Sequence, residues 1–543
     1  MYRLIVLLLL ICLFIKQNNA DFESSDIAVD TDPYASTQKC NWKKCKAHGF
    51  PNSTFGYSVD CCTLSVPLNY AQPNETINIS MTRFSPGGPY ASTKKNTLFV
   101  LSGGPGQSGW DLFYDTQLIP ASYGITLILP DHRGTGLSTL LSCDENGSQD
   151  VNVDCIKYLK SKYGVNGLKQ FSVTSAAHDL SIQIQAYKKN NPSRIAIYAV
   201  NYGTFWLNRF LLIYPNLTHS AVMDGLFHPL LSSVSRNDLG VATISYEFLK
   251  YCEQQVECGQ HFPVNQQPFK MLQNILHQMD LNNQICFKKH LIKFNLNSET
   301  LRTLFFNLMA NGNNYFDRTI IPAVIFRLNR CNADDVSILK HFFRVSLKAT
   351  NPPSNPKNPP GFLFSNVTNF NIVESEIYLA MNESDVDNSV IKRWYNATVF
   401  AQKNPIKYNV LRSQWPKYRL DRYRYKISSY SPLLMITGQL DATLITYHAE
   451  LLASITTKTR TFYEIPLAGH ITSTLAQVGY TCPLQLICSW LFPSVFPKDW
   501  KNPSCIRDLP VTIDFAGETS HGRDISMKFF NISHPFGPNN YDI

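Results

Sequence analysis

Short apolar runs bounded by glycine and proline occur in the first half of the chain and predict buried parallel strands. A stretch of alternating polar and apolar residues precedes them and predicts a further strand over Thr76–Phe84. Between the runs, Ala176–Lys189 and Tyr202–Tyr214 have the apolar spacing of helices. The apolar runs cover Thr97–Leu101, Ile125–Leu129, Ile195–Val200 and Ala221–Met223. This alternation predicts an α/β fold, a mostly parallel central sheet with helices on both faces.

The pattern changes after about His228 and stays different as far as Tyr425. Helical stretches such as Ser298–Asn311 and Val373–Met381 dominate there. The proline-rich segment 351–360 cannot form regular structure.

Strand-like runs return at Pro432–Thr437 and Thr461–Ile465. We therefore expect one α/β core interrupted by a large, mainly helical cap insertion, over the carboxyl ends of the strands where sites lie in such sheets. The expected boundaries are 21–227 for a Cys-rich N-terminal segment and first part of the core, 228–428 for the cap, and 429–543 for the rest of the core and the C-terminal region.

The N-terminus has the pattern of a signal peptide. Arg3 precedes an apolar run of 12 residues, Leu4–Ile15, and Asn-Asn-Ala follows before Asp21. The run is too short to cross a bilayer core of roughly 30 Å as a helix. We expect cleavage after residue 20, export to the outside or to the secretory-lysosomal lumen, and no transmembrane segment in the mature chain.

Cysteines and glycosylation triplets agree with export. Of 14 cysteines, Cys12 would leave with the signal peptide, and most of the others should pair in an oxidising compartment. Local spacing favours the pairs Cys143–Cys155, Cys252–Cys258 and Cys286–Cys331. Two further bridges should join Cys40, Cys45, Cys61 and Cys62 in an open order, and Cys505 should pair with Cys482 or Cys488. Nine Asn-x-Ser/Thr triplets predict a glycosylated surface, at Asn52, Asn74, Asn78, Asn146, Asn216, Asn366, Asn382, Asn396 and Asn531.

The composition and net charge of the chain narrow its class and its possible partners only slightly. With 44% hydrophobic and 16% charged residues the chain is globular, and a net charge of +9 is thinly spread over 543 residues. The densest basic stretch, interleaved with tyrosines, holds Lys417, Arg419, Arg422, Arg424 and Lys426. A nucleic-acid strip is conceivable there, but no longer basic tract supports it, so we expect a connector and no nucleic-acid partner.

Two glycine-rich segments follow predicted strands. In residues 102–109, Ser-Gly-Gly-Pro-Gly-Gln-Ser-Gly, glycines would let backbone N–H groups face a bound oxyanion, although a tight turn is the alternative. No Gly-Lys-Ser/Thr follows, which excludes a phosphate loop. In residues 130–138 we expect Asp131 and Arg133 to tie the loop down and not to catalyse.

A third segment, residues 198–204, reads Tyr-Ala-Val-Asn-Tyr-Gly-Thr between a predicted strand and helix. A nucleophile elbow needs small residues two before and two after the nucleophile, and Ala199 and Gly203 meet this need. The nucleophile position holds Asn201. A carboxamide is a poor nucleophile and cannot be activated by histidine as a hydroxyl is.

An acid and a histidine follow in order. Asp441 lies in a loop after a predicted strand, and His470 ends Leu-Ala-Gly-His 29 residues later. Either residue alone is more often structural, but the order elbow, acid, histidine is that of α/β-hydrolases. Asp441 would orient His470 and stabilise its charge.

Together with Met-Asp-Gly at 223–225, these motifs resemble those of the proline iminopeptidases and tripeptidyl aminopeptidases, closest to the secreted tripeptidyl branch. The match covers roughly Leu98–Gly225 and Pro432–Cys505, and the cap is not matched residue by residue. The resemblance implies an α/β-hydrolase fold and release of short peptides from a free N-terminus through an acyl-enzyme on serine. We expect no cofactor and no metal.

By the same resemblance His470 is the base, Asp441 orients it, and backbone N–H groups of Tyr202 and of Gly103 or Gly104 form the oxyanion hole. The family's serine maps to Asn201. Loss of such a serine costs about a million-fold in rate, or roughly 8 kcal/mol.

The substitution favours a secreted, aminopeptidase-like homologue that is catalytically impaired and binds peptides, a small acyl ligand or a partner. One alternative is an active serine-aminopeptidase-type hydrolase that releases N-terminal residues or tripeptides by a modified mechanism, for example after deamidation of Asn201 to a carboxylate nucleophile. The bulky Tyr202 that follows does not favour deamidation. A purely structural glycoprotein is the third hypothesis.

Overall fold

The computed structural model describes residues 38–45, 57–87, 96–112, 123–264, 266–310, 315–350, 361–379, 381, 387–402, 409–455 and 460–537. The expected signal peptide and the proline-rich segment 351–360 lie outside these residues.

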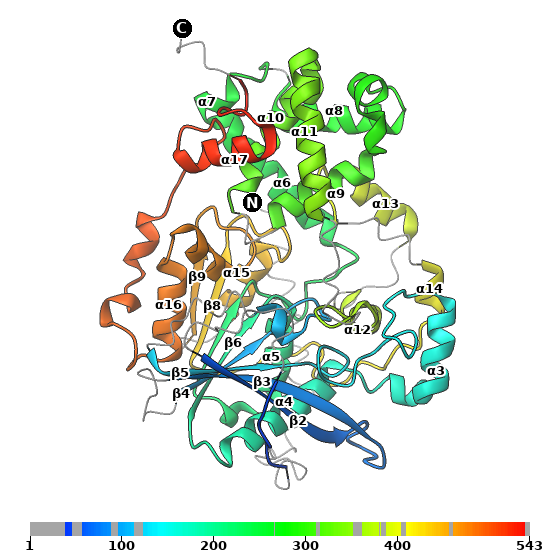
Figure 1. The fold of residues 1–543 in the computed structure, drawn as a ribbon, viewed down its shortest axis with the longest axis vertical. Coiled ribbons are helices and arrows are strands. Elements are labelled where there is room, and N and C mark those ends of the chain that lie inside the picture. Colours follow the sequence, from blue (N-terminus) through cyan, green and yellow to red (C-terminus); the bar gives the residue numbers. More distant parts are fainter. Residues whose placement is uncertain are drawn as a thin grey trace.

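One mixed sheet forms the centre of the molecule (Figure 1). In the part of the chain that the structure describes, its nine strands lie in the order β1-β2-β3-β5-β4-β6-β7-β8-β9. The pairs from β5 through β4 to β9 are parallel, and β1, β2 and β3 continue the sheet antiparallel at one edge. The strands are β1 Lys43–Lys44, β2 Tyr57–Pro67, β3 Thr76–Pro86, β4 Asn96–Leu101, β5 Ile125–Pro130, β6 Arg194–Val200, β7 Ser220–Asp224, β8 Leu433–Gly438 and β9 Arg460–Ile465. The strands expected from the apolar runs are confirmed to within two residues, whereas β2 was not anticipated.

Helices cover both faces of this sheet, as the alternation of elements predicts. Along β4, Phe99 and Leu101 pack in one cluster with α4 and α5, while Leu98 and Val100 pack in another with α16. The core helices are α3 Val153–Leu168, α4 Val173–Lys188, α5 Tyr202–Ile213, α15 Thr446–Ser454 and α16 Cys482–Leu491. Strands buried on both faces explain why their sequences are continuously apolar.

Between β7 and β8 the chain is mainly helical. The helices are α6 Asn237–Gln254, α7 Val256–Gly259, α8 Pro268–Asp280, α9 Ser298–Ala310, α10 Ile321–Arg330, α11 Ala333–Thr350, α12 Asn366–Ile372, α13 Asn388–Ala397 and α14 Asn409–Gln414. The helices α6–α11 form a body with its own hydrophobic core, which the C-terminal helix α17 (Ser520–Phe530) joins through Phe529 and Phe530 (Figure 1). By contrast, Phe370 of α12 and Trp415 belong to the core cluster on the sheet. The expected boundaries of the cap stay a prediction.

The expected helix Val373–Met381 is wrong at its start. The helix begins at Asn366, and Val373–Ile377 continues it as a π-helical turn. The Ser365 hydroxyl accepts a hydrogen bond from the Thr368 N–H at 3.1 Å and so caps the N-terminus of this helix.

Six disulfides join the described cysteines. The three pairs expected from spacing, Cys143–Cys155, Cys252–Cys258 and Cys286–Cys331, are confirmed. The open order at the N-terminus is resolved as Cys40–Cys62 and Cys45–Cys61, and Cys505 pairs with Cys482. Cys488 is a buried free thiol.

The asparagines of the described triplets are all exposed, at Asn74, Asn78, Asn146, Asn216, Asn366, Asn396 and Asn531; Asn52 and Asn382 lie outside the described residues.

Within the described ranges, no helix is long and apolar enough to span a bilayer. The basic stretch is a connector without regular structure, and Arg424 is buried in it and donates to the carbonyl groups of Glu376 and Pro229.

Candidate active site at the strand ends

Asn201 occupies a sharp turn between β6 and α5. Its backbone has φ 54° and ψ −128°, a conformation that side chains rarely adopt. Gly203 follows where a Cβ would lie 2.5 Å from the Leu101 carbonyl oxygen, so only glycine fits. Ala199 is fully buried in the sheet core. The turn therefore has the shape that the small residues around Asn201 predict.

Asp441 and His470 reach Asn201 from the ends of β8 and β9. The His470 Nδ1 lies 2.8 Å from Asp441 Oδ2, and His470 Nε2 lies 2.7 Å from Asn201 Nδ2. Asp441 is fully buried, and its other oxygen accepts hydrogen bonds from the Thr443 and Leu444 N–H groups, both at 2.8 Å. The structure thus brings together three residues that lie far apart in the sequence.

The hydrogen-bond partners of His470 indicate which ring nitrogen carries the proton. Asp441 can only accept when ionised, so Nδ1 carries the hydrogen and Nε2 accepts from the Asn201 amide. Burial lowers the pKa of His470, but the Asp441 and Asp224 carboxylates together raise the pKa above its ordinary value. Protonation of Nε2 would set an N–H against the Asn201 NH2 group, so this contact favours the neutral ring.

The other end of the Asn201 carboxamide faces the glycine-rich loop. Its Oδ1 accepts from the Tyr202 N–H at 2.6 Å and from the Gly104 N–H at 3.1 Å. At Gly103 a Cβ would lie 2.8 Å from Asn201 Cβ and 2.7 Å from Gln107 Oε1, so the approach needs a glycine. The two N–H groups expected to face an oxyanion converge on one point, and the Asn201 oxygen lies there.

Asp131 and Arg133 tie their loop down, as expected. Arg133 is fully buried and donates to both Asp179 oxygens, at 2.6 and 2.7 Å. Asp131 accepts from the Ser108 hydroxyl at 2.6 Å and from two backbone N–H groups. Burial raises the pKa of Asp131 to about 6, and these hydrogen bonds lower it in part.

Asp224 has a role that sequence reasoning missed. This buried carboxylate accepts from the Thr472 N–H at 2.8 Å, the Ser473 N–H at 3.1 Å and the Tyr198 hydroxyl at 2.8 Å. It therefore fixes the segment that follows His470. The motif Met-Asp-Gly at the end of β7 contains Asp224, but from the sequence alone this aspartate indicates only where a strand ends.

The chain has an α/β-hydrolase fold. The strand order of the sheet, the helices on both faces and the turn after β6 are those of this fold. No protein-family model matches the sequence, and no curated protein matches it.

Solved structures of several α/β-hydrolases are similar in outline. An esterase from Thermogutta terrifontis has 12% identity and a TM-score of 0.33, over 80% of this chain and 99% of its own. A bromoperoxidase from Bacillus anthracis has 14% identity and a TM-score of 0.32, over 79% and 99%. A peroxisomal alpha-beta-hydrolase from Saccharomyces cerevisiae has 10% identity and a TM-score of 0.34, over 87% and 95%.

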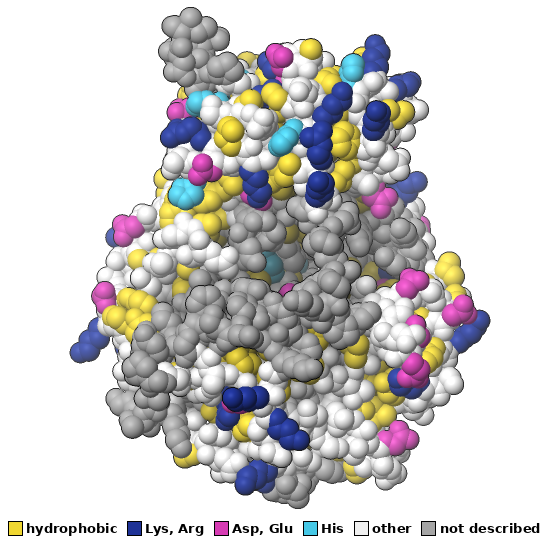
Figure 2. Space-filling view, in the orientation of Figure 1, with side chains coloured by type: hydrophobic (Ala, Val, Ile, Leu, Met, Phe, Trp, Pro, Cys, Tyr) yellow, Lys and Arg dark blue, Asp and Glu magenta, His cyan; other side chains and the backbone are white. Residues whose placement is uncertain are grey.

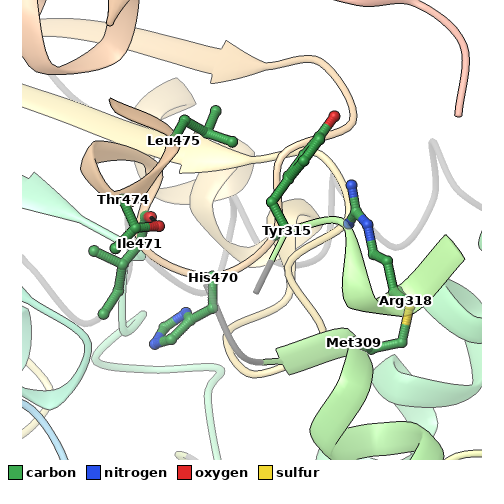
Figure 3. Close-up of a pocket in the computed structure, with 8 residues that line it drawn as sticks. Met309, Tyr315, Arg318, His470, Ile471, Thr474 and Leu475 are labelled. Carbon is green, nitrogen blue, oxygen red and sulfur yellow. Dashed lines mark hydrogen bonds between the residues drawn. The ribbon is translucent and has the colours of Figure 1, made fainter. Parts of the chain in front are cut away.

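A narrow pocket opens beside this α/β-hydrolase site. In Figure 2, Lys and Arg side chains gather on the helical body above the part that holds the sheet. The pocket is lined by Met309, Tyr315, Arg318, Gly469, His470, Ile471, Thr474 and Leu475 (Figure 3). Nothing in the sequence distinguishes Arg318 as a pocket residue from the other arginines of the helical insertion. Among the described residues, no three His, Cys, Asp or Glu side chains converge as a metal site requires.

Proposed function

We propose that this chain is a secreted, aminopeptidase-like α/β-hydrolase homologue in which Asn201 blocks acyl transfer, and that it binds peptides or a protein partner. The observation that carries the proposal is the position of the Asn201 carboxamide. Its oxygen accepts from the Tyr202 and Gly104 N–H groups, and its nitrogen faces His470.

Acyl transfer needs an attacking atom and an empty oxyanion hole. Asn201 supplies no hydroxyl for His470 to deprotonate. Its Oδ1 also takes both backbone donors that would stabilise a tetrahedral oxyanion. The substitution therefore opposes catalysis in two ways, through the missing nucleophile and through the filled hole.

The Asp441–His470 pair supports the alternative of an active hydrolase. The pair keeps a 2.8 Å hydrogen bond in a buried setting, as a catalytic base requires. A modified nucleophile would be needed, for example a carboxylate formed by deamidation of Asn201. Peptide mapping for aspartate at position 201 tests this route directly.

The main test compares the protein with its Asn201→Ser variant, using a fluorophosphonate probe and amino-terminal peptide amides. A serine is smaller than asparagine, so it restores the hydroxyl and vacates the oxyanion hole in one step. We expect no labelling of the original protein, and labelling of Ser at position 201 together with peptide turnover in the variant.

Two controls decide the outcome. Asn201→Ala also empties the hole but adds no nucleophile, so it should remain unlabelled. Turnover by the original protein that is abolished in His470→Ala would overturn the block at Asn201 and establish the active hydrolase instead.

A further inference from the structure

Two segments of the helical body contain basic residues and no acidic ones. They are residues 281–294, between α8 and α9, and residues 336–348 of α11. Neither holds an Asp or Glu, although the whole chain has 40 of these against 49 Lys and Arg. Among the described residues no carboxylate forms an ion pair with their basic side chains, and the ion pairs of this body instead involve Arg327, Arg330 and Lys528. The Lys and Arg side chains of the two segments are all exposed, at Lys288, Lys289, Lys293, Lys340, Arg344 and Lys348.

Aromatic contacts and a disulfide hold the two segments side by side. The Phe287 and Phe294 rings each lie 5.8 Å from the Phe343 ring of α11. The disulfide Cys286–Cys331 joins the first segment to the chain just before α11 begins. Basic residues that lie apart in the sequence therefore share one side of the helical body.

The basic residues of α11 lie on its outer face. Lys340, Arg344 and Lys348 recur every fourth residue, whereas the buried Phe342 and Ser346 lie on the other side of the helix. Like charges at this spacing repel one another. Together with the three lysines of residues 281–294 they form what we call the basic face. Figure 2 shows Lys and Arg side chains gathered on this body, with hydrophobic side chains beside them.

Exposed aliphatic side chains accompany the lysines of the first segment. Leu281, Ile285 and Ile292 are 53%, 62% and 71% exposed. A soluble polyanion, such as a nucleic acid or a sulfated polysaccharide, offers only charge to such a surface. The interface of an anionic bilayer offers negative headgroups and an apolar layer directly below them. Lysine suits this place, because its stem is apolar and its ammonium group can reach the headgroups.

We propose that the basic face, with Ile285 and Ile292, binds the surface of a membrane that contains anionic phospholipids. The Lys and Arg side chains contact the lipid phosphates and carboxylates, and the two isoleucines enter the apolar layer. Each basic side chain near such a surface strengthens binding by about fivefold. The inference does not use the site at Asn201 and does not depend on the proposed function.

The first arm of the test is cosedimentation of the full glycosylated chain with lipid vesicles. We expect binding to phosphatidylcholine vesicles that contain about one fifth phosphatidylserine, and none to phosphatidylcholine alone. Binding should weaken as sodium chloride is added, because salt screens the attraction between exposed charges. Equal binding to the two kinds of vesicle, or no binding to either at low salt, would overturn the inference.

The second arm removes charge from the basic face. The double variant Lys288→Gln with Lys289→Gln should bind the anionic vesicles at least about tenfold more weakly. The control is Lys43→Gln with Lys44→Gln, an adjacent pair of exposed lysines in β1. This control changes the net charge by the same amount and should bind as the original protein does. An equal loss in the two double variants would show that only net charge matters, and would contradict a defined face.

The third arm separates a membrane from a soluble polyanion. Ile292→Ser should weaken vesicle binding by about fivefold, because it removes apolar surface that enters the bilayer. Val511→Ser is the matched control, since Val511 is also 71% exposed. Heparin is the polyanion probe. Heparin binding together with vesicle binding that Ile292→Ser leaves unchanged would overturn the membrane in favour of a polyanion.

Discussion

Arg133 in the core and Arg318 in the helical body are both buried, and their surroundings are opposite. Arg133 donates to both Asp179 oxygens and to the carbonyl groups of Leu68 and Gln170. Arg318 donates from Nη2 to the Leu467 carbonyl and lies beside the Tyr315 ring, and among the described residues no carboxylate forms an ion pair with it (Figure 3). Removing one partner of a buried ion pair is costly because the other charge stays buried and unpaired, whereas removing an arginine that has no carboxylate partner leaves no such charge behind.

Replacing Arg133 should have the largest effect on stability. In Arg133→Met the Asp179 carboxylate stays buried without its cation, which typically costs about 3–5 kcal/mol. Urea denaturation should show the loss. The double variant Arg133→Met with Asp179→Leu should recover much of it, and failure to recover would mean that the carbonyl contacts of Arg133 matter more than the ion pair.

His132, beside Arg133, should make the core sensitive to acid. Burial lowers the pKa of His132 to about 4, from about 6.5 in the unfolded chain. Between these values the unfolded state binds a proton that the folded state does not, so unfolding free energy falls by up to about 1.4 kcal/mol per unit as pH decreases. Urea denaturation between pH 6.5 and 4 should show a shallower fall for His132→Gln.

The slope of unfolding free energy against pH decides this test, because His132→Gln also changes two hydrogen bonds at every pH and so shifts the free energy itself. The His132 ring contacts the Arg133 carbonyl at 2.7 Å and the Tyr202 hydroxyl at 3.2 Å. An unchanged slope would mean that His132 does not resist protonation in the folded protein.

Replacing Arg318 should have a small effect on stability. Arg318→Met exchanges an uncompensated buried charge for an apolar side chain, which leaves stability within about 1 kcal/mol or raises it. Urea denaturation is the measurement. A loss as large as that expected for Arg133→Met would show that Arg318 has a structural role through Leu467 and the aromatic rings.

The smallest effect is expected at Arg330, which is 42% exposed and shares Asp335 with Arg327. Arg330→Gln leaves Asp335 paired, so the change should stay within about 0.5 kcal/mol. The same denaturation experiment checks it. A larger loss would mean that the two arginines act as one network around Asp335.

The sequence was informative where local chemistry decides the structure. Apolar runs predicted the parallel strands, and spacing predicted the disulfides of Cys143, Cys252 and Cys286. Small residues at Ala199 and Gly203 predicted the sharp turn at Asn201. These features depend on neighbours in the chain, so a single sequence contains them.

Features that depend on long-range packing were not predictable. Arg318 lies more than a hundred residues from Leu467, and its missing partner is visible only once Asp317 is seen to bind Lys528. The addition of α17 to the helical body likewise depends on Phe529 and Phe530 meeting a distant cluster. The roles of Asp441 and His470 stay predictions until the variants at position 201 are measured.

The oxygen of Asn201 has a consequence for any ligand that carries a carbonyl group. The side chain is a tethered competitor for the Tyr202 and Gly104 N–H groups, present at the high effective concentration of an intramolecular group. An incoming carbonyl must displace it, so the apparent affinity equals the intrinsic affinity reduced by the fraction of molecules in which the side chain has turned away. Ligands that bind away from these two N–H groups do not meet this competition.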